Sequence, residues 1–113
     1  MMEDRYQSTI KYSVQVSSSG DNTILTAPSS GREYKLRFMQ VQNASGVDTT
    51  ALIKFGSTTV LSVVMPSKGD GEVLPVEDEM SARVGDANAL VVNLSGANAT
   101  WVTVWYETVP TLG

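Results

Sequence analysis

Apolar and polar residues alternate along most of this chain, and clusters of turn-forming residues interrupt the alternation about every ten residues. A β-strand points successive side chains to opposite faces, so this alternation is typical of strands that bury one face. No long window of the sequence has the 3.6-residue period of an amphipathic helix. The pattern therefore predicts an all-β protein built from short strands.

The expected strands follow one another almost without interruption. The first, at residues 10–16, has the alternation of a half-buried strand, and the breakers at 17–22 predict a turn. Pro75 cannot donate a ladder hydrogen bond, so its segment is expected to be an edge strand or an extended crossover. The other strands are expected at 23–27, 32–44, 51–55, 58–65, 72–76, 80–84, 89–95 and 99–109.

The expected strand at 32–44 contains a break in its hydrophobic phase. Leu36 and Phe38 share one parity, whereas Met39 and Val41 share the other. A β-bulge would insert one residue and restore the inward row. A strand buried on both faces also fits, and the sequence leaves both explanations open.

The number of strands and the chain length together indicate the fold class. The 113 residues suit one domain. We predict an antiparallel two-sheet β-sandwich, jelly-roll-like, with eight to nine strands formed by residues 8–113 and preceded by a polar N-terminal arm at 1–7. An immunoglobulin-like sandwich is the alternative, although its Cys–Trp–Cys pattern is absent.

Composition argues against several classes of function. The chain has no Cys and no His, which excludes disulfides and thiolate metal sites and removes the usual general base. The formal charge of −4 and the absence of a Lys or Arg cluster argue against nucleic-acid binding. No sequence pattern places two carboxylates across a cleft. We therefore predict a protein that is not an enzyme, with no catalytic residues, no metal and no cofactor.

The N-terminal residues MMEDRYQ lack an apolar run behind a basic segment, so we expect no signal peptide. No stretch approaches the roughly 18 apolar residues of a membrane span. The expectation is a soluble protein that is made in a cytoplasm.

Two polar features have simple structural explanations. The carboxylates at 77–79, with Asp70, Glu72 and Asp86 nearby, contain oxygen ligands for a cation such as calcium, but the spacing matches no calcium loop. A solvated acidic loop is the expectation. Three Asn-X-Ser/Thr patterns begin at Asn43, Asn93 and Asn98, and we interpret them as turn chemistry.

The strand expected at 99–109 carries both tryptophans on one face. Trp101, Thr103, Trp105 and Glu107 share that face, and Val102, Val104 and Tyr106 share the core face. The tryptophan face is a partner interface, a second buried layer or a ligand-stacking surface. Tyr6 in the arm needs a partner to pack against. The candidate partner interface therefore consists of Tyr6, Trp101, Thr103, Trp105 and Glu107.

The second half of the chain resembles small jelly-roll or β-sandwich virion proteins of tailed bacteriophages. The similar segments are 53–61, 73–75, 85–95 and 102–106, and the chain departs at 77–80, where some relatives have a Gly/Trp pair. The resemblance implies a trimer on a capsid exterior, or on a tail or head fibre, without catalytic residues.

This resemblance leads to two functional hypotheses. The first is a capsid decoration (cement) protein, made in the host cytoplasm, that binds the major capsid protein as a homotrimer on the outer shell. Its bound copies would stabilise the assembled lattice by linkage. The alternative is a carbohydrate-binding or receptor-binding module of a phage fibre or tail tip, in which Trp101 or Trp105 stacks on sugar rings.

Overall fold

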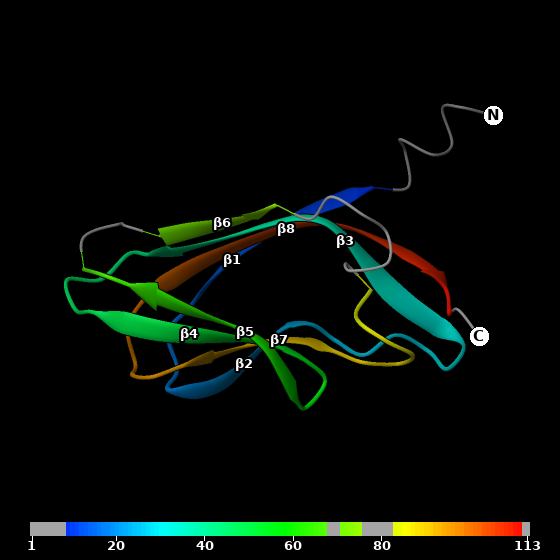
Figure 1. The fold of residues 1–113 in the computed structure, drawn as a ribbon, viewed down its shortest axis with the longest axis horizontal. Coiled ribbons are helices and arrows are strands. Elements are labelled where there is room, and N and C mark those ends of the chain that lie inside the picture. Colours follow the sequence, from blue (N-terminus) through cyan, green and yellow to red (C-terminus); the bar gives the residue numbers. More distant parts are fainter. Residues whose placement is uncertain (1–8, 68–70, 76–82, 112–113) are drawn as a thin grey trace.

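A computed structural model describes residues 9–67 and 83–111 in full and the backbone of residues 71–75. Two β-sheets lie one above the other (Figure 1). The described residues form eight strands: β1 (Ile10–Val16), β2 (Gly20–Leu25), β3 (Arg32–Asn43), β4 (Thr49–Phe55), β5 (Thr58–Met65), β6 (Gly71–Pro75), β7 (Leu90–Leu94) and β8 (Thr100–Pro110).

The strand order is that of a jelly roll. Sheet A has the order β1-β8-β3-β6, and sheet B has the order β2-β7-β4-β5. The first strand therefore pairs with the eighth, the second with the seventh, the third with the sixth and the fourth with the fifth, all antiparallel. A long hairpin rolled into two sheets has this pairing. The predicted jelly-roll sandwich is confirmed, and the order differs from that of an immunoglobulin domain.

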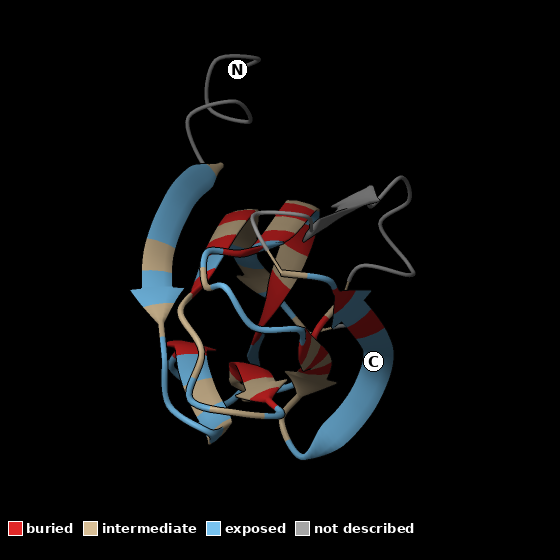
Figure 2. Ribbon diagram, turned by 90° about the vertical axis from the view of Figure 1, so that its left-hand side faces the viewer, coloured by how far each residue is buried: buried red, intermediate tan, exposed pale blue. Residues whose placement is uncertain are grey.

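The core lies between the sheets and follows the predicted parity. Val102 and Val104 of β8 are completely buried, as are Val41 of β3 and Val92 of β7. Figure 2 shows the alternation as buried and partly exposed bands along the central strands. These side chains form one cluster, so burial of this row holds the two sheets together.

The break in hydrophobic phase is a β-bulge. Leu36 lies opposite Tyr106 and Phe38 lies opposite Trp105, so Arg37 is the extra residue on β3. Met39 returns to the core with 1% of its surface exposed. The bulge explanation is therefore correct, and a strand buried on both faces is not needed.

β2 begins before its expected start, and the described residues of the strand expected at 80–84 form no strand. β2 starts at Gly20, inside the expected turn, because Gly20 and Asp21 pair with Leu94 and Asn93 of β7. Of the strand expected at 80–84, residues 80–82 lie outside the described residues, and Arg83 forms a single bridge with Lys35. The segment with Pro75 is β6, an edge strand that pairs with β3, as predicted.

An ion pair fixes the segment before β7 to the long end of sheet A. Glu33 is 3% exposed and accepts hydrogen bonds from Arg83 Nη1 at 2.8 Å and from the Gly85 amide at 3.0 Å. The Val84 amide donates to the Tyr34 carbonyl at 3.0 Å. This segment therefore covers a part of sheet A that the shorter strands of sheet B do not reach.

Candidate binding face on the outside of sheet A

The candidate residues on β8 lie on the outer face of sheet A. β8 is flanked by β1 and β3, so its outward residues Trp101, Thr103 and Trp105 have a neighbour on both sides. The tryptophan face is a surface rather than a second buried layer, since Trp101 is exposed. The outward side chains of the three strands form three cross-strand rows. From one end they are Gln15–Trp101–Gln42, Ser13–Thr103–Gln40 and Lys11–Trp105–Phe38.

The ring of Trp105 has neighbours on this face. Phe38 meets it edge-on with 5.1 Å between ring centroids, and Lys11 Nζ lies 5.4 Å from the Trp105 centroid. Both contacts match the electrostatics of an aromatic ring, whose face is negative and whose edge is positive. Trp105 is therefore half-buried by its own sheet and offers little free ring surface.

Trp101 differs from Trp105 because it is exposed and borders a hollow. The exposed fraction of Trp101 is 43%. The hollow has a volume of about 300 Å³ and is lined by Ser13, Gln40, Gln42, Trp101 and Thr103. Ser13 Oγ and Thr103 Oγ1 are hydrogen-bonded at 2.8 Å. The lining combines one aromatic ring with neutral amide and hydroxyl groups.

The remaining candidate residues have different positions. Glu107 Oε2 pairs with Arg37 Nε at 3.1 Å and accepts a hydrogen bond from Thr9 Oγ1 at 3.4 Å, so its carboxylate is engaged within the face. Tyr6 lies outside the described residues. The structure thus brings Trp101 and Thr103 together at the hollow and separates Trp105 and Glu107 from it.

Sequence reasoning missed three residues of the hollow: Ser13, Gln40 and Gln42. Their parity within β1 and β3 points them away from the core, which was a usable signal. Their proximity to Trp101 depends on the β1–β8 and β3–β8 registers, which join residues about 57 to 96 positions apart. Local patterns do not specify that register.

The polar motifs have structural roles where the structure describes them. Asp86 Oδ1 accepts hydrogen bonds from the Gly31 amide at 2.7 Å and from Thr111 Oγ1 at 2.8 Å. Asn43 is completely buried and donates to the carbonyls of Val47 and Pro66. The contacts of Asn43 agree with the turn interpretation, but that interpretation is wrong for Asn93, which lies within β7 and donates to Asp21. The acidic residues at 77–79 and Asp70 lie outside the described residues.

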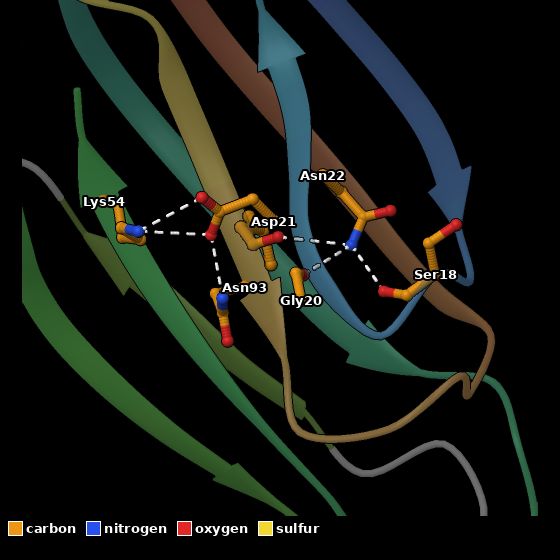
Figure 3. A network of polar contacts seen from close by, with 7 residues as sticks. Ser18, Gly20, Asp21, Asn22, Lys54 and Asn93 are labelled. Atoms are coloured by element: carbon orange, nitrogen blue, oxygen red, sulfur yellow. Dashed lines mark hydrogen bonds and ion pairs between the residues drawn. The ribbon is translucent and has the colours of Figure 1, made fainter. Parts of the chain in front are cut away.

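A second polar network lies on the outer face of sheet B (Figure 3). Asp21 Oδ1 accepts hydrogen bonds from Asn93 Nδ2 at 2.8 Å and from Lys54 Nζ at 3.1 Å. These two hydrogen bonds, that of Asn93 first, hold the pKa of Asp21 below its ordinary value of 3.8. The network connects β2, β7 and β4 and thereby ties the edge strand to the sheet.

Some apolar side chains stay exposed on the edge strands β1 and β5, although they alternate with the outward residues and point toward the core side of their sheet. We call the two sides of the sandwich that these edge strands form its open margins, and such side chains core-parity side chains. On edge strand β1, Ile10 and Tyr12 lie opposite the core residues Tyr106 and Val104, yet they are 48% and 40% exposed. The expectation of a half-buried first strand is wrong at these two positions, since sheet B does not cover them. On edge strand β5, Leu61 lies opposite Ile53 and is 38% exposed.

The described residues show neither a metal site nor a membrane helix. Across 9–67 and 83–111, no three side chains of His, Cys, Asp or Glu gather into a group that could hold a metal ion. In the described part of the chain, no helix is long and apolar enough to cross a membrane.

Comparisons with known proteins support the fold. No family model and no curated protein matches this chain. A solved structure from the Bacillus endospore appendages, a family of disulfide-linked pili, is similar to it with a TM-score of 0.51 and 15% sequence identity. The similarity covers 93% of this chain and 88% of the appendage chain. At this identity the likeness establishes a shared β-sandwich fold.

Proposed function

We propose that the chain is a structural protein of a tailed-bacteriophage virion. Specifically, it is a capsid decoration protein that binds the major capsid protein on the shell exterior as a homotrimer and stabilises the shell. The observation that carries this proposal is the exposure of core-parity apolar side chains at both open margins. The resemblance of segments 53–61, 73–75, 85–95 and 102–106 to phage virion proteins supports the virion assignment.

The margins favour association with further chains. An edge strand has unpaired backbone groups, and exposed apolar side chains beside it promote pairing with another chain. Ile10 and Tyr12 lie at one margin, and Val60 and Leu61 lie at the opposite one. Contact between two different margins is heterologous, and three copies related by a closed rotation would form a trimeric ring.

The chemistry of this assembly is non-covalent. The endospore appendage protein of similar fold belongs to disulfide-linked pili, whereas this chain has no Cys. Disulfide bonds therefore cannot join its subunits, and the proposed association relies on backbone pairing and apolar burial. Binding of such a protein to the assembled shell, but not to free capsid subunits, stabilises the shell by an amount that increases with the ratio of free protein concentration to dissociation constant.

The direct test compares virus particles with and without the protein. Particles that carry it should rupture at a higher temperature, because its binding free energy must be lost before the shell opens. Equal rupture temperatures at full occupancy would refute the decoration role. Failure of the protein to sediment with particles would refute its place on the virion.

A matched pair of variants tests the margins. Tyr12→Lys adds a charge at the β1 margin, whereas Val47→Lys adds the same charge at an exposed loop position, where 55% of the side chain is exposed. Tyr12→Lys should abolish the trimer and the gain in rupture temperature, and Val47→Lys should leave both unchanged. A trimer that survives Tyr12→Lys would exclude this margin as the contact.

A further inference from the structure

We infer that the hollow beside Trp101 is a binding site for a neutral saccharide. The site is independent of the proposed assembly contacts, since edge-to-edge association occurs in the plane of the sheets and leaves the outer face of sheet A open. It consists of the side chains of Ser13, Gln40, Gln42, Trp101 and Thr103.

The ring of Trp101 supplies the apolar part of such a site. Its exposed fraction is 43%, although β8 has a neighbouring strand on both sides. An exposed aromatic face matches the C–H face of a hexopyranose, which is the apolar surface of an otherwise polar molecule. Trp105 is more buried than Trp101, and Phe38 and Lys11 contact its ring.

The groups around the ring match the polar part of a sugar. Gln40 lies on β3 beside β8, and its side-chain amide can both donate and accept hydrogen bonds. Ser13 and Thr103 add two hydroxyls that already hydrogen-bond to each other at 2.8 Å. Sugar hydroxyls also donate and accept, so this lining can pair with them without a charged partner.

Size and charge favour a small neutral ligand. A hollow of about 300 Å³ lies at the lower end of the range of small-molecule sites. A stable protein partner would need about 800 Å² of surface on each side, much more than this hollow offers. No side chain of the lining is charged, and the formal charge of −4 disfavours acidic sugars and nucleic acid.

The site should bind weakly in a single copy. A mono- or disaccharide offers few atoms for contact, so we expect a dissociation constant on the order of 1 mM. Several copies on one particle would raise the avidity for a glycan-covered surface without any new contact.

Fluorescence titration of the full-length protein tests this inference. The chain has two tryptophans, so Trp105→Phe leaves Trp101 as the single reporter. The probes are glucose, galactose, mannose, N-acetylglucosamine, cellobiose and lactose, with adenosine as a comparison ligand whose purine base stacks on aromatic rings. At least one sugar should produce a saturable change in the emission of Trp101, and calorimetry on the unchanged protein should give the same affinity.

Variants then assign the binding to the hollow. Trp101→Ala should weaken binding about tenfold or more, and Gln40→Ala should also weaken it, whereas Val47→Ala should not. Melting curves confirm that each variant is folded. The inference is overturned if none of the six sugars binds, if binding survives Trp101→Ala, or if adenosine binds more tightly than every sugar.

Discussion

At the scale of single residues, the turn before β7 depends on a glycine with no space for a side chain. Gly85 has a φ of +104°, and an added Cβ would lie 2.6 Å from Asn88 Nδ2. That nitrogen donates to the Val84 carbonyl at 3.1 Å. The glycine therefore serves both the backbone conformation and the position of the Asn88 amide.

Gly85→Ala should lower the free energy of unfolding by about 2 kcal/mol, because it combines backbone strain with displacement of the Asn88 amide. Gly46→Ala is the control, since nothing lies within 4 Å of its added Cβ. It should change stability by less than about 0.5 kcal/mol. Urea denaturation measures both, and equal values for the two variants would contradict the role of the Asn88 contact.

The Asp21 network predicts a dependence of stability on pH. The folded-state pKa of Asp21 lies below the 3.8 expected for an unfolded chain. The stabilisation that the Asp21 carboxylate provides is therefore fully present above pH 3.8 and is lost as the pH falls through the folded-state pKa. The melting temperatures of the wild type and Asp21→Asn should differ at pH 6 and converge toward pH 2. A difference that stays constant over this range would show that the carboxylate charge is not responsible.

At the scale of strands, the bulge in β3 corrects the phase of the sequence pattern. Because Arg37 is the extra residue, Leu36 and Phe38 keep their partners Tyr106 and Trp105 whether or not it is present. Deletion of Arg37 should therefore give a regular ladder with the same inward row. Deletion of Gln40, in the regular part of the strand, should shift one half of β3 by one residue, so that its inward side chains point outward and its outward ones inward.

Thermal unfolding followed by circular dichroism compares the two deletions. The protein without Arg37 should unfold cooperatively, with a loss of stability of about 1 to 2 kcal/mol. The protein without Gln40 should lack a cooperative transition. Equal destabilisation by both deletions would mean that Arg37 is not the inserted residue.

Local patterns predicted most strands because alternation reports side-chain direction directly. The start of β2 was not predictable in this way, since Gly20 and Asp21 are turn-forming residues that become a strand only through pairing with β7. Alternation also placed Ile10 and Tyr12 on the core face without revealing that they stay exposed. Whether a core-facing side chain is buried depends on whether the opposite sheet extends over it, and that is a property of the folded molecule.

At the scale of the whole molecule, the hollow on sheet A depends on the pairing of strands within one sheet, and the open margins depend on how the two sheets are placed. The tryptophan face was predictable from one strand, whereas the hollow needs three strands in register. The margins depend on how the two sheets overlap (Figure 1). Sequence therefore identified Trp101 and Thr103 as candidates but not the residues of β1 and β3 beside them, and it gave no indication of the exposed margins.

The central claim is that these margins join copies of the chain, and light scattering coupled to size-exclusion chromatography tests it most directly. The protein should elute at three times its chain mass of 12.1 kDa, and Tyr12→Lys should elute as a folded monomer. A wild-type protein that remains a monomer at all concentrations would contradict the claim.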